Sequence, residues 1–278
     1  MASLQEVFQE PSPVAMVTGS GAARLGRSIA AHLAALGCRI ALHANTSVKE
    51  AEQAAMEIRQ EQAVETMIVQ GNLEEPSVAD RLVSQVQHQF GRLDILVNSA
   101  AIWKPSGLEQ VTAEEALRYL KINALGSFLV ARAAGLVMVE QPSGGSIINL
   151  GDWATHRPYL DHAAYFPSKG AVEAMTRSLA VELAHRNPKV RVNCIQPGTV
   201  LLGEGVSDDD ARLVASCALV GRVGTPDHIA MTVQFLCEND FVTGVCLPVD
   251  GGRSIYAPDG YQTRRVCGQP EPPVSGND

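Results

Sequence analysis

The segment VTGSGAARLGRSIA, residues 17–30, joins a short apolar run, VAMVT (14–18), to an amphipathic helix predicted from about Arg24 to Leu36. Its glycines at positions 19, 21 and 26 allow the backbone to approach a pyrophosphate, which then lies at the N-terminus of the helix. A Gly-rich turn between a strand and a helix can also be ordinary turn chemistry, so the segment alone is weak support for a ligand. Its position at the first strand–helix junction favours a dinucleotide site.

The same alternation of a short apolar run and an amphipathic helix repeats along the chain. Strands are predicted at residues 14–18, 39–43, 66–70, 94–98, 145–150, 190–195 and 245–249. The other helices are predicted from near Ser47, within 76–90, over Ala113–Glu140 and over Ala163–His185. This order specifies an α/β fold, a single doubly wound Rossmann domain with a seven-stranded parallel sheet and helices on both faces. The domain is predicted over residues 12–256, followed by an extended or disordered tail, 257–278, rich in Pro, Gly and polar residues.

The composition disfavours several classes of partner. The formal charge is −8 with a pI of about 5.4, and the basic residues form no run, so no nucleic acid or anionic membrane is expected to bind. Six cysteines without a CxxC pair indicate reduced thiols and a cytoplasmic protein. The start, MASLQEVFQEPSP, lacks the basic and apolar regions of a signal peptide. The apolar stretch ALGSFLVARAAGLVMV contains Arg132 and is short for a membrane span, so a buried helix is predicted there.

An acidic run, Asp208–Asp210, follows Ser207 and precedes the apolar stretch ARLVASCALV. Such a run can suggest a metal site. Acidic residues also suit the positive end of a helix dipole, so we predict a helix N-terminus here and no metal.

The end of the second predicted strand, LHANTS, indicates which cofactor the chain uses. An NAD site usually presents Asp or Glu at this place, where the carboxylate holds the ribose hydroxyls and repels a 2′-phosphate. Here no acidic residue occurs until Glu50, whereas Asn45, Thr46 and Ser47 can donate hydrogen bonds and Arg24 can add positive charge. Ser47 can also be a helix N-cap, which does not exclude phosphate binding. We therefore predict NADPH/NADP⁺.

The stretch GDWATHRPYLDHAAYFPSKG, residues 151–170, contains residues suited to proton transfer. Tyr165 and Lys169 are four residues apart, a spacing that places both on one helix face. Asp152 lies thirteen residues before the tyrosine, on the loop after an apolar run. An ordinary surface pair of Tyr165 and Lys169 is the alternative, which the motifs in the rest of the chain disfavour.

Together these residues resemble the short-chain dehydrogenase/reductase family across about residues 12–253. The matching pieces are Thr18-Gly19, LVNSAA after the fourth strand, Asn123 in KINALGSF, Tyr165-x-x-x-Lys169, QPG (196–198) and PVDGG (248–252). The resemblance implies that Tyr165 is the proton donor and that Lys169 holds the nicotinamide ribose and lowers the tyrosine pKa. Asn123 would support a water relay to Lys169. The implied cofactor contacts are Gly19, Ser20, Arg24, Leu25, Asn45, Thr46, Ser47, Asn72, Leu73, Asn98, Ser99, Ala100, Tyr165, Lys169, Pro197 and Gly198.

Asp152 departs from most of that family, in which a Ser at this place donates a hydrogen bond to a substrate carbonyl. An ionised carboxylate cannot donate to a carbonyl oxygen and repels an alkoxide. It can accept hydrogen bonds from a nitrogen heterocycle, or share a proton with Tyr165, which suits reduction of a C=N bond. The exchange resembles the pteridine reductases and dihydromonapterin reductases of the family, as do RLGRSIA, the LHxxxS end of the second strand and NSAAIW.

This closer resemblance implies an NADPH-dependent reductase of a pteridine-type substrate, a dihydropterin or dihydrofolate. The implied substrate contacts are Arg24, Trp103, Asp152 and Tyr165, with the Trp103 ring stacked on the pterin. A hydrophobic loop anchor is the alternative for Trp103. Three departures from the pteridine reductases concern the cofactor: a first turn one residue longer, Asn72 where Asp is usual, and Ser99 and Ala101 after Asn98.

Two rival functions remain open at this stage. One is a short-chain oxidoreductase for a ketone, sugar or acyl substrate, with Asp152 merely bonded to its own loop. The other is a non-catalytic NADPH-binding protein, which would not need Asn123, Tyr165 and Lys169 together. Family resemblance and the two Ala-rich helices, 113–140 and 163–185, predict a homotetramer. Whether the segment Leu201–Leu219 closes as a lid is left open.

Overall fold

The computed structural model describes residues 2–203 and 205–256, and the predicted tail 257–278 lies outside the described residues. Within this part of the chain, seven parallel strands form one sheet in the order β3-β2-β1-β4-β5-β6-β7. The strands are β1 (Val14–Val17), β2 (Arg39–Ala44), β3 (Thr66–Gln70), β4 (Ile95–Asn98), β5 (Gly145–Leu150), β6 (Val190–Pro197) and β7 (Cys246–Val249). The predicted α/β class, the single Rossmann domain and its seven-stranded parallel sheet are confirmed.

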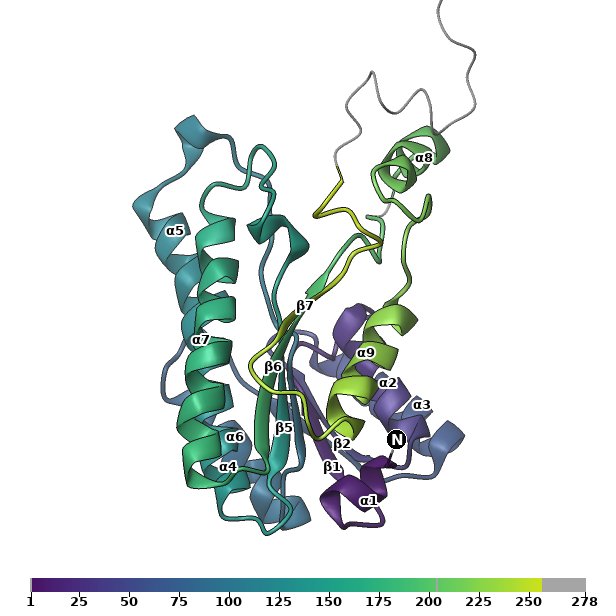
Figure 1. Cartoon of the computed structure of the whole chain (residues 1–278), viewed down its shortest axis with the longest axis vertical. Helices are drawn as coiled ribbons and strands as arrows, with labels where there is room; N and C mark the ends of the chain where they lie inside the picture. The colour runs from purple at the N-terminus through teal and green to yellow at the C-terminus, as the bar shows by residue number, and fades with distance from the viewer. Residues whose placement is uncertain (1, 204, 257–278) are drawn as a thin grey trace, which may run out of the picture.

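Helices cover both faces of this sheet (Figure 1), and so its central strands are buried along their whole length. One layer contains α1 (Leu4–Phe8), α2 (Leu25–Ala35), α3 (Val48–Gln62) and α9 (Pro226–Glu238). The opposite layer contains α4 (Val78–Phe90), α5 (Ala113–Tyr119), α6 (Ser127–Val139) and α7 (Tyr165–Arg186). Burial on both faces explains why β1, β4 and β5 read as continuous apolar runs rather than alternating ones.

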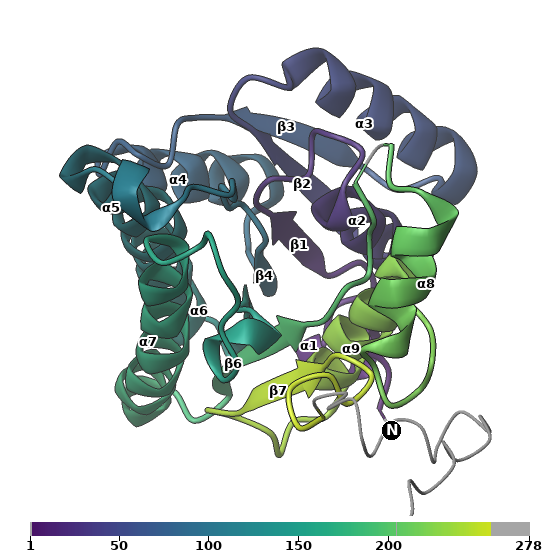
Figure 2. The same ribbon diagram turned by 90° about the horizontal axis from the view of Figure 1, so that it is seen from above.

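The end of the sheet where the strands terminate carries the irregular segments. Short helical turns, Leu108–Gln110 and Trp153–Thr155, lie there, together with α8 (Asp208–Ser216). Seen from above, α5 and α8 lie on opposite sides of this end (Figure 2). The Ser207 hydroxyl accepts a hydrogen bond from the Asp210 backbone N–H at 3.1 Å, so the predicted acidic start of this helix is confirmed.

The predicted long helix 113–140 contains an interruption at its centre. A π-helical segment, Leu120–Gly126, separates α5 from α6, a feature that is frequent at functional sites. A side chain at Gly126 would place its Cβ 2.7 Å from the Leu73 carbonyl oxygen, so the glycine allows close contact with the loop after β3. By length and composition the helix Ala113–Val139 could cross a membrane, and 50% of its most apolar window is buried inside this fold.

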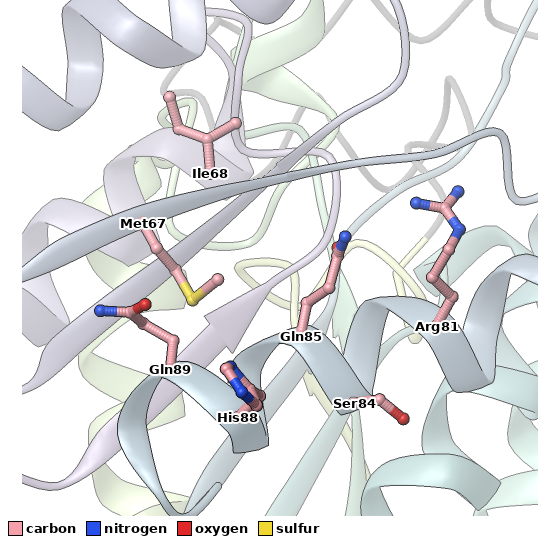
Figure 3. A pocket seen from close by; sticks show the side chains of 7 residues that line it. All are labelled: Met67, Ile68, Arg81, Ser84, Gln85, His88 and Gln89. Carbon is pink, nitrogen blue, oxygen red and sulfur yellow. The ribbon is translucent and has the colours of Figure 1, made fainter.

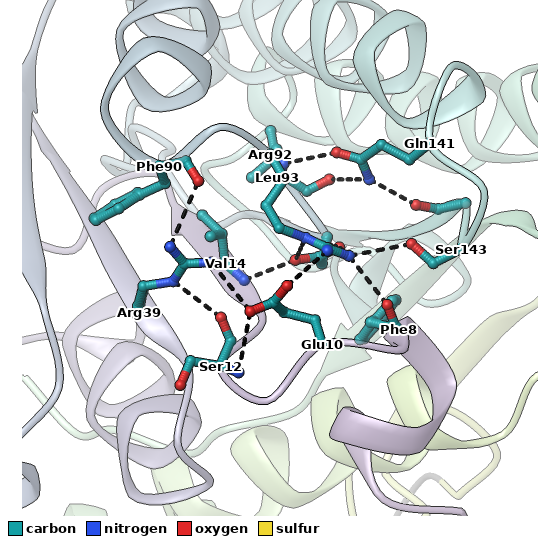
Figure 4. A network of polar contacts seen from close by, with 12 residues as sticks. Phe8, Glu10, Ser12, Val14, Arg39, Phe90, Arg92, Leu93, Gln141 and Ser143 are labelled. Carbon is teal, nitrogen blue, oxygen red and sulfur yellow. Dashed lines mark hydrogen bonds and ion pairs between the residues drawn. The ribbon is translucent and has the colours of Figure 1, made fainter.

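Two helices were not predicted, α1 and α9, and a polar network attaches the first of them to the sheet (Figure 4). The Arg92 guanidinium contacts the Asp94 carboxylate at 2.6 Å and the Glu10 carboxylate at 2.8 Å, and it donates to the Phe8 carbonyl at 3.0 Å. Asp94 is fully buried and also accepts from the Val14 backbone N–H. Burial raises the pKa of Asp94, and the hydrogen bonds from Arg92 oppose that shift.

Removal of this guanidinium should destabilise the fold strongly. Arg92→Met leaves the buried Asp94 without its positive partner, which we expect to cost about 3 kcal/mol of unfolding free energy. The matched control is Arg186→Met, which breaks an exposed pair with Glu182 and should cost about 0.5 kcal/mol or less. Urea denaturation measures the unfolding free energy of both variants. Equal losses of unfolding free energy would contradict the role of Arg92 as the stabilising partner of Asp94.

Candidate active site

One cleft of about 800 Å³ lies at the carboxyl ends of the strands. Chain order reverses between β1 and β4, so the loops that follow these strands diverge and leave a crevice, the usual ligand site of such sheets. Most of the predicted site residues line this cleft: Gly19, Arg24, Leu25, Asn45, Thr46, Ser47, Asn72, Leu73, Ser99, Ala100, Trp103, Asp152, Tyr165, Lys169, Pro197 and Gly198. The structure thus brings together residues that are as far apart in sequence as Gly19 and Gly198.

Two predicted cofactor contacts lie outside the cleft lining. The Ser20 side chain is fully buried, where it donates to the Val17 carbonyl at 2.7 Å and accepts from the His43 backbone N–H at 3.1 Å. The Asn98 amide donates to Ser127 O and to Asn149 Oδ1, both at 3.0 Å. Internal hydrogen bonds therefore occupy the Ser20 hydroxyl and the Asn98 amide N–H groups, while Asn98 Oδ1 is buried without a partner among the described residues.

Asn123 is also buried and bonded within the protein. Its carboxamide accepts from the Ile102 backbone N–H at 2.8 Å and donates to the Ile102 carbonyl at 3.0 Å and to Ser168 Oγ at 3.1 Å. These contacts join the π-helical segment to α7 and to the chain just before Trp103. The water relay implied for Asn123 stays a prediction, and the structure places its side chain in a positioning role.

The Gly-rich first turn packs closely against the loop after β4. Gly19 has a φ of +65°, a conformation that favours glycine, and a Cβ there would lie 2.7 Å from Ala100 Cα. A Cβ at Gly21 would lie 2.6 Å from Ser47 Oγ, so this glycine lets the turn meet the end of β2. The glycines thereby bring the Gly-rich first turn and the segment Asn45–Ser47 to the same end of the cleft.

The His43 side chain holds this turn in place, a role that was not predicted from the sequence. Its ring lies between the Gly19 backbone N–H, 3.1 Å from Nδ1, and the Gly71 carbonyl, 3.0 Å from Nε2. Burial lowers the pKa of His43, which keeps the ring neutral, with Nδ1 accepting and Nε2–H donating. The histidine therefore links the first turn to the end of β3.

The adenosine end of the cleft fits a phosphorylated ribose. Arg24, Asn45, Thr46 and Ser47 line it together, and the α3 helix begins at Val48, directly after these polar side chains. The Glu74 carboxylate also lines the cleft, 3.7 Å from the Arg118 guanidinium, which offsets its negative charge. The hydroxyl and amide donors at this end, together with the Arg24 guanidinium, suit the 2′-phosphate of NADP⁺.

Asp152, Tyr165 and Lys169 meet at the other end of the cleft. The Tyr165 hydroxyl donates to Asp152 Oδ2 at 2.8 Å, and Asp152 Oδ1 accepts from the Ala154 backbone N–H at 2.9 Å. Lys169, one turn along α7 from the tyrosine, donates from Nζ to the Leu150 carbonyl at 2.8 Å. The tyrosine hydrogen is thus directed at the carboxylate and not at the lysine.

Burial and charge set the proton affinities of this group. Burial raises the pKa of Tyr165, and the nearby Asp152 carboxylate raises it further, so the phenol keeps its proton over the physiological range. Burial lowers the pKa of Lys169, and the Asp152 charge opposes that shift. The phenol can donate its proton to a substrate, although the raised pKa makes it a weaker acid and is opposite to the lowering by Lys169 that the family resemblance implied.

The loop that carries Asp152 is attached to α7 by a buried carboxylate. Glu173 accepts hydrogen bonds from the Thr155 hydroxyl and, at 2.8 Å, from the Gln196 side-chain amide. The Thr155 hydroxyl also bonds to the Asp152 carbonyl at 2.8 Å. This arrangement holds the loop that carries Asp152 against α7, the helix that carries Tyr165 and Lys169.

Aromatic side chains form one wall of the cleft. The Trp103 ring stacks on the His162 imidazole at 4.8 Å between centroids, and its indole N–H donates to the Tyr159 hydroxyl at 3.3 Å. Trp103 remains 55% exposed and lines the cleft, so it can still stack on a flat ligand. His162 and Tyr159 were missed in the sequence analysis, because no spacing rule links them to Trp103.

Other hollows of the surface lie apart from this chemistry. A groove of about 430 Å³ lies between β3 and α4, lined by Met67, Ile68, Arg81, Ser84, Gln85, His88 and Gln89 (Figure 3). It is on the edge of the sheet, away from the strand ends. A second hollow of about 550 Å³ adjoins the cleft and shares Arg24 and Trp103 with it.

Comparisons with known proteins agree with this fold. Residues 21–254 match the profile of a family described as enoyl-(acyl carrier protein) reductase. The chain is 36% identical over 247 residues to an uncharacterised oxidoreductase of Methylorubrum extorquens, covering 86% of this chain and 96% of the relative. It is 34% identical over 256 residues to NADPH-dependent aldehyde reductase 2, chloroplastic, of Arabidopsis thaliana, covering 86% and 93%. Carbonyl reductase family member 4 of Xenopus laevis is 33% identical over 172 residues, covering 62% and 71%.

Proposed function

The chain belongs to the short-chain dehydrogenase/reductase family, whose members are oxidoreductases with a nicotinamide cofactor, and we propose that it is an NADPH-dependent reductase of a pteridine-type substrate. The observation that carries the proposal is the hydrogen bond from Tyr165 to Asp152. When bound, the cofactor supplies a hydride. The protein supplies the proton from the Tyr165 hydroxyl and places a carboxylate beside the reducible bond.

The Asp152 carboxylate determines which substrate this site tolerates. A ketone or aldehyde becomes an alkoxide as it is reduced, and a carboxylate next to that oxygen raises the energy of the transition state. A C=N bond gives a nitrogen that needs a proton, and a pteridine adds ring N–H and amino donors that a carboxylate can accept. A flat heterocycle also matches the open face of Trp103.

Reduction of an aldehyde or another carbonyl compound is the second candidate. The aldehyde reductase of Arabidopsis and the carbonyl reductase family member of Xenopus favour it over a pteridine. In that case Asp152 would serve its own loop through the Ala154 N–H, and Tyr165 would turn its hydroxyl toward the substrate.

A substrate comparison tests the proposal. Loss of NADPH absorbance is followed with the purified protein, with a dihydropterin in one series and an aromatic aldehyde in the other. We expect kcat/KM to favour the dihydropterin by about a hundredfold or more, because only this substrate offers N–H donors to the Asp152 carboxylate. The reverse preference would replace the proposal with the second candidate.

Preference for NADPH over NADH is the first of two further predictions. Arg24→Ala should raise the KM for NADPH about tenfold, the effect of one charge-assisted hydrogen bond. Ser47→Asp should raise it similarly and also improve the use of NADH, because a carboxylate suits free ribose hydroxyls. Arg59→Ala, on α3 and outside the cleft lining, is the control and should change neither constant. Equal efficiency of the unmodified protein with both cofactors would contradict the prediction.

Assembly into a homotetramer is the second prediction. The helices of the layer that contains α5, α6 and α7 expose apolar side chains, among them Leu117, Leu136 and Val181. Light scattering at micromolar concentration should give four times the 29.6 kDa mass of the chain. Val181→Glu should lower that mass, since it places a charge on the exposed face of α7. A single-chain mass for the unmodified protein would refute the assembly.

A further inference from the structure

Two cysteines lie side by side on the last two strands of the sheet. Cys194 of β6 and Cys246 of β7 are Cα partners in the parallel register, so their side chains leave the same face of the sheet. Neighbouring strands are about 4.8 Å apart, within the range of about 4.4–6.8 Å between Cα atoms that a disulfide bridges. The backbone thus already meets the main geometric demand of a disulfide.

The two thiols differ in ways that assign them different chemical roles. Cys246 is partly exposed, and the Arg177 guanidinium of α7 donates to its Sγ at 3.3 Å. The neighbouring Cys194 thiol lowers the pKa of Cys246, and Arg177 lowers it further, against partial burial and the Glu173 charge. Cys194 is completely buried, its thiol donates to the Ile195 carbonyl at 3.5 Å, and the nearby Cys246 together with burial raises its pKa. Cys246 is therefore the more acidic and more accessible thiol of the pair, with Cys194 beside it in the strand register.

The remaining cysteines of the described residues lack this combination. Cys38 and Cys237 are both fully buried, and burial raises the pKa of Cys38 and brings that of Cys237 to about 11. Cys217 directly follows α8, and its thiol donates to the Leu213 carbonyl. These cysteines supply internal controls for a test of reactivity.

The buried member of the pair touches the floor of the active site. A Cβ at Gly151 would lie 2.8 Å from Cys194 Sγ, so the sulfur packs directly under the residue that precedes Asp152. Lys169 binds the carbonyl of Leu150, the residue before Gly151. Movement of the Cys194 sulfur therefore reaches the backbone that positions both catalytic groups.

We propose that Cys194 and Cys246 form a dithiol that a hydroperoxide converts reversibly into a disulfide, with loss of reductase activity. The Cys246 thiol loses its proton, the thiolate attacks an oxygen of hydrogen peroxide, and the O–O bond breaks to give a sulfenic acid, while the leaving hydroxide takes up the proton to become water. The Cys194 thiol then attacks the sulfenic sulfur, forms the S–S bond and releases a second water. Two thiols lose two electrons and two protons, and one hydrogen peroxide is reduced to two waters. A dithiol reductant reverses the step.

Peptide mapping tests the chemistry independently of the enzymatic assignment. The full-length protein is treated with hydrogen peroxide, its free thiols are alkylated, and the digest is analysed by mass spectrometry without reduction. We expect one cross-linked peptide pair that contains Cys194 and Cys246, absent from Cys246→Ser and retained in Cys217→Ser. Oxidation of Cys246 without a link to Cys194, or a link to any other cysteine, would overturn the dithiol.

Activity supplies the second readout, which rests on the proposed reductase function. Oxidised protein should turn over about tenfold more slowly, the scale of a small displacement at catalytic groups, and dithiothreitol should restore the rate. Cys246→Ser should keep its rate in peroxide. Formation of the disulfide with an unchanged rate would overturn the inhibitory effect. Failure of the mapping would instead reject the dithiol and leave the proposed function untouched.

Discussion

Replacement of Tyr165 by Phe is expected to lower turnover by about a hundredfold or more, the usual scale of positioned acid catalysis. The substitution removes one oxygen and keeps the ring, which packs in the aromatic cluster with Tyr119 and Phe166. Binding of NADPH, measured by fluorescence titration, should stay unchanged, because the loss lies in proton delivery. The result identifies the Tyr165 hydroxyl as the proton donor.

Tyr119→Phe is the matched control for this experiment. Its ring contacts Tyr165 edge to face, and its hydroxyl donates to the Lys104 carbonyl at 3.0 Å. Loss of that hydroxyl should change turnover by about twofold or less, since the interaction is one neutral hydrogen bond away from the reacting atoms. Retention of more than half the activity in Tyr165→Phe would mean that another group delivers the proton.

The elements of this fold could be predicted from local pattern. Short apolar runs marked all seven strands, because strands covered on both faces must be apolar along their length. The helices α1 and α9 were missed, since one is only five residues long and the other follows a long irregular connection. The break at Leu120–Gly126 was missed as well, because Asn123 leaves the helical pattern to bond with Ile102, a contact distant in sequence.

The candidate site, too, could be predicted from the sequence only in part. Residues at the ends of strands, such as Gly19, Asp152 and Gly198, meet in one cleft because parallel strands end at one edge of the sheet. The side-chain directions depend on tertiary contacts, so the sequence did not indicate that Ser20 and Asn98 face inward. His43 and His162 carry no motif, and only their neighbours in space define what they do.

Asp152→Asn is expected to lower reduction of a dihydropterin by about a hundredfold while NADPH binding is retained. The amide oxygen can still accept from the Ala154 N–H, and Asn is a good residue at the start of a helical turn, so the loop should keep its fold. The amide lacks the charge that holds the Tyr165 proton and accepts the N–H groups of the substrate. If the melting temperature is unchanged while the activity is lost, the substitution has impaired catalysis and not stability.

Asp152→Ser restores the residue that most of the family carries, and it tests the substrate class most directly. The serine hydroxyl can donate to a carbonyl oxygen and carries no charge to repel the developing alkoxide, so aldehyde reduction should rise. Dihydropterin reduction should fall by about a hundredfold, because the shorter, neutral hydroxyl replaces the charged two-oxygen acceptor that receives the ring N–H groups and the Tyr165 hydroxyl. Serine is also a good residue at the start of a helical turn, so the loop should keep its fold. A change from dihydropterin to aldehyde reduction would therefore not be explained by loss of loop structure. If Asp152→Ser reduced the dihydropterin as fast as the unmodified protein, the carboxylate would serve its loop alone. The carbonyl function indicated by the relatives would then take precedence.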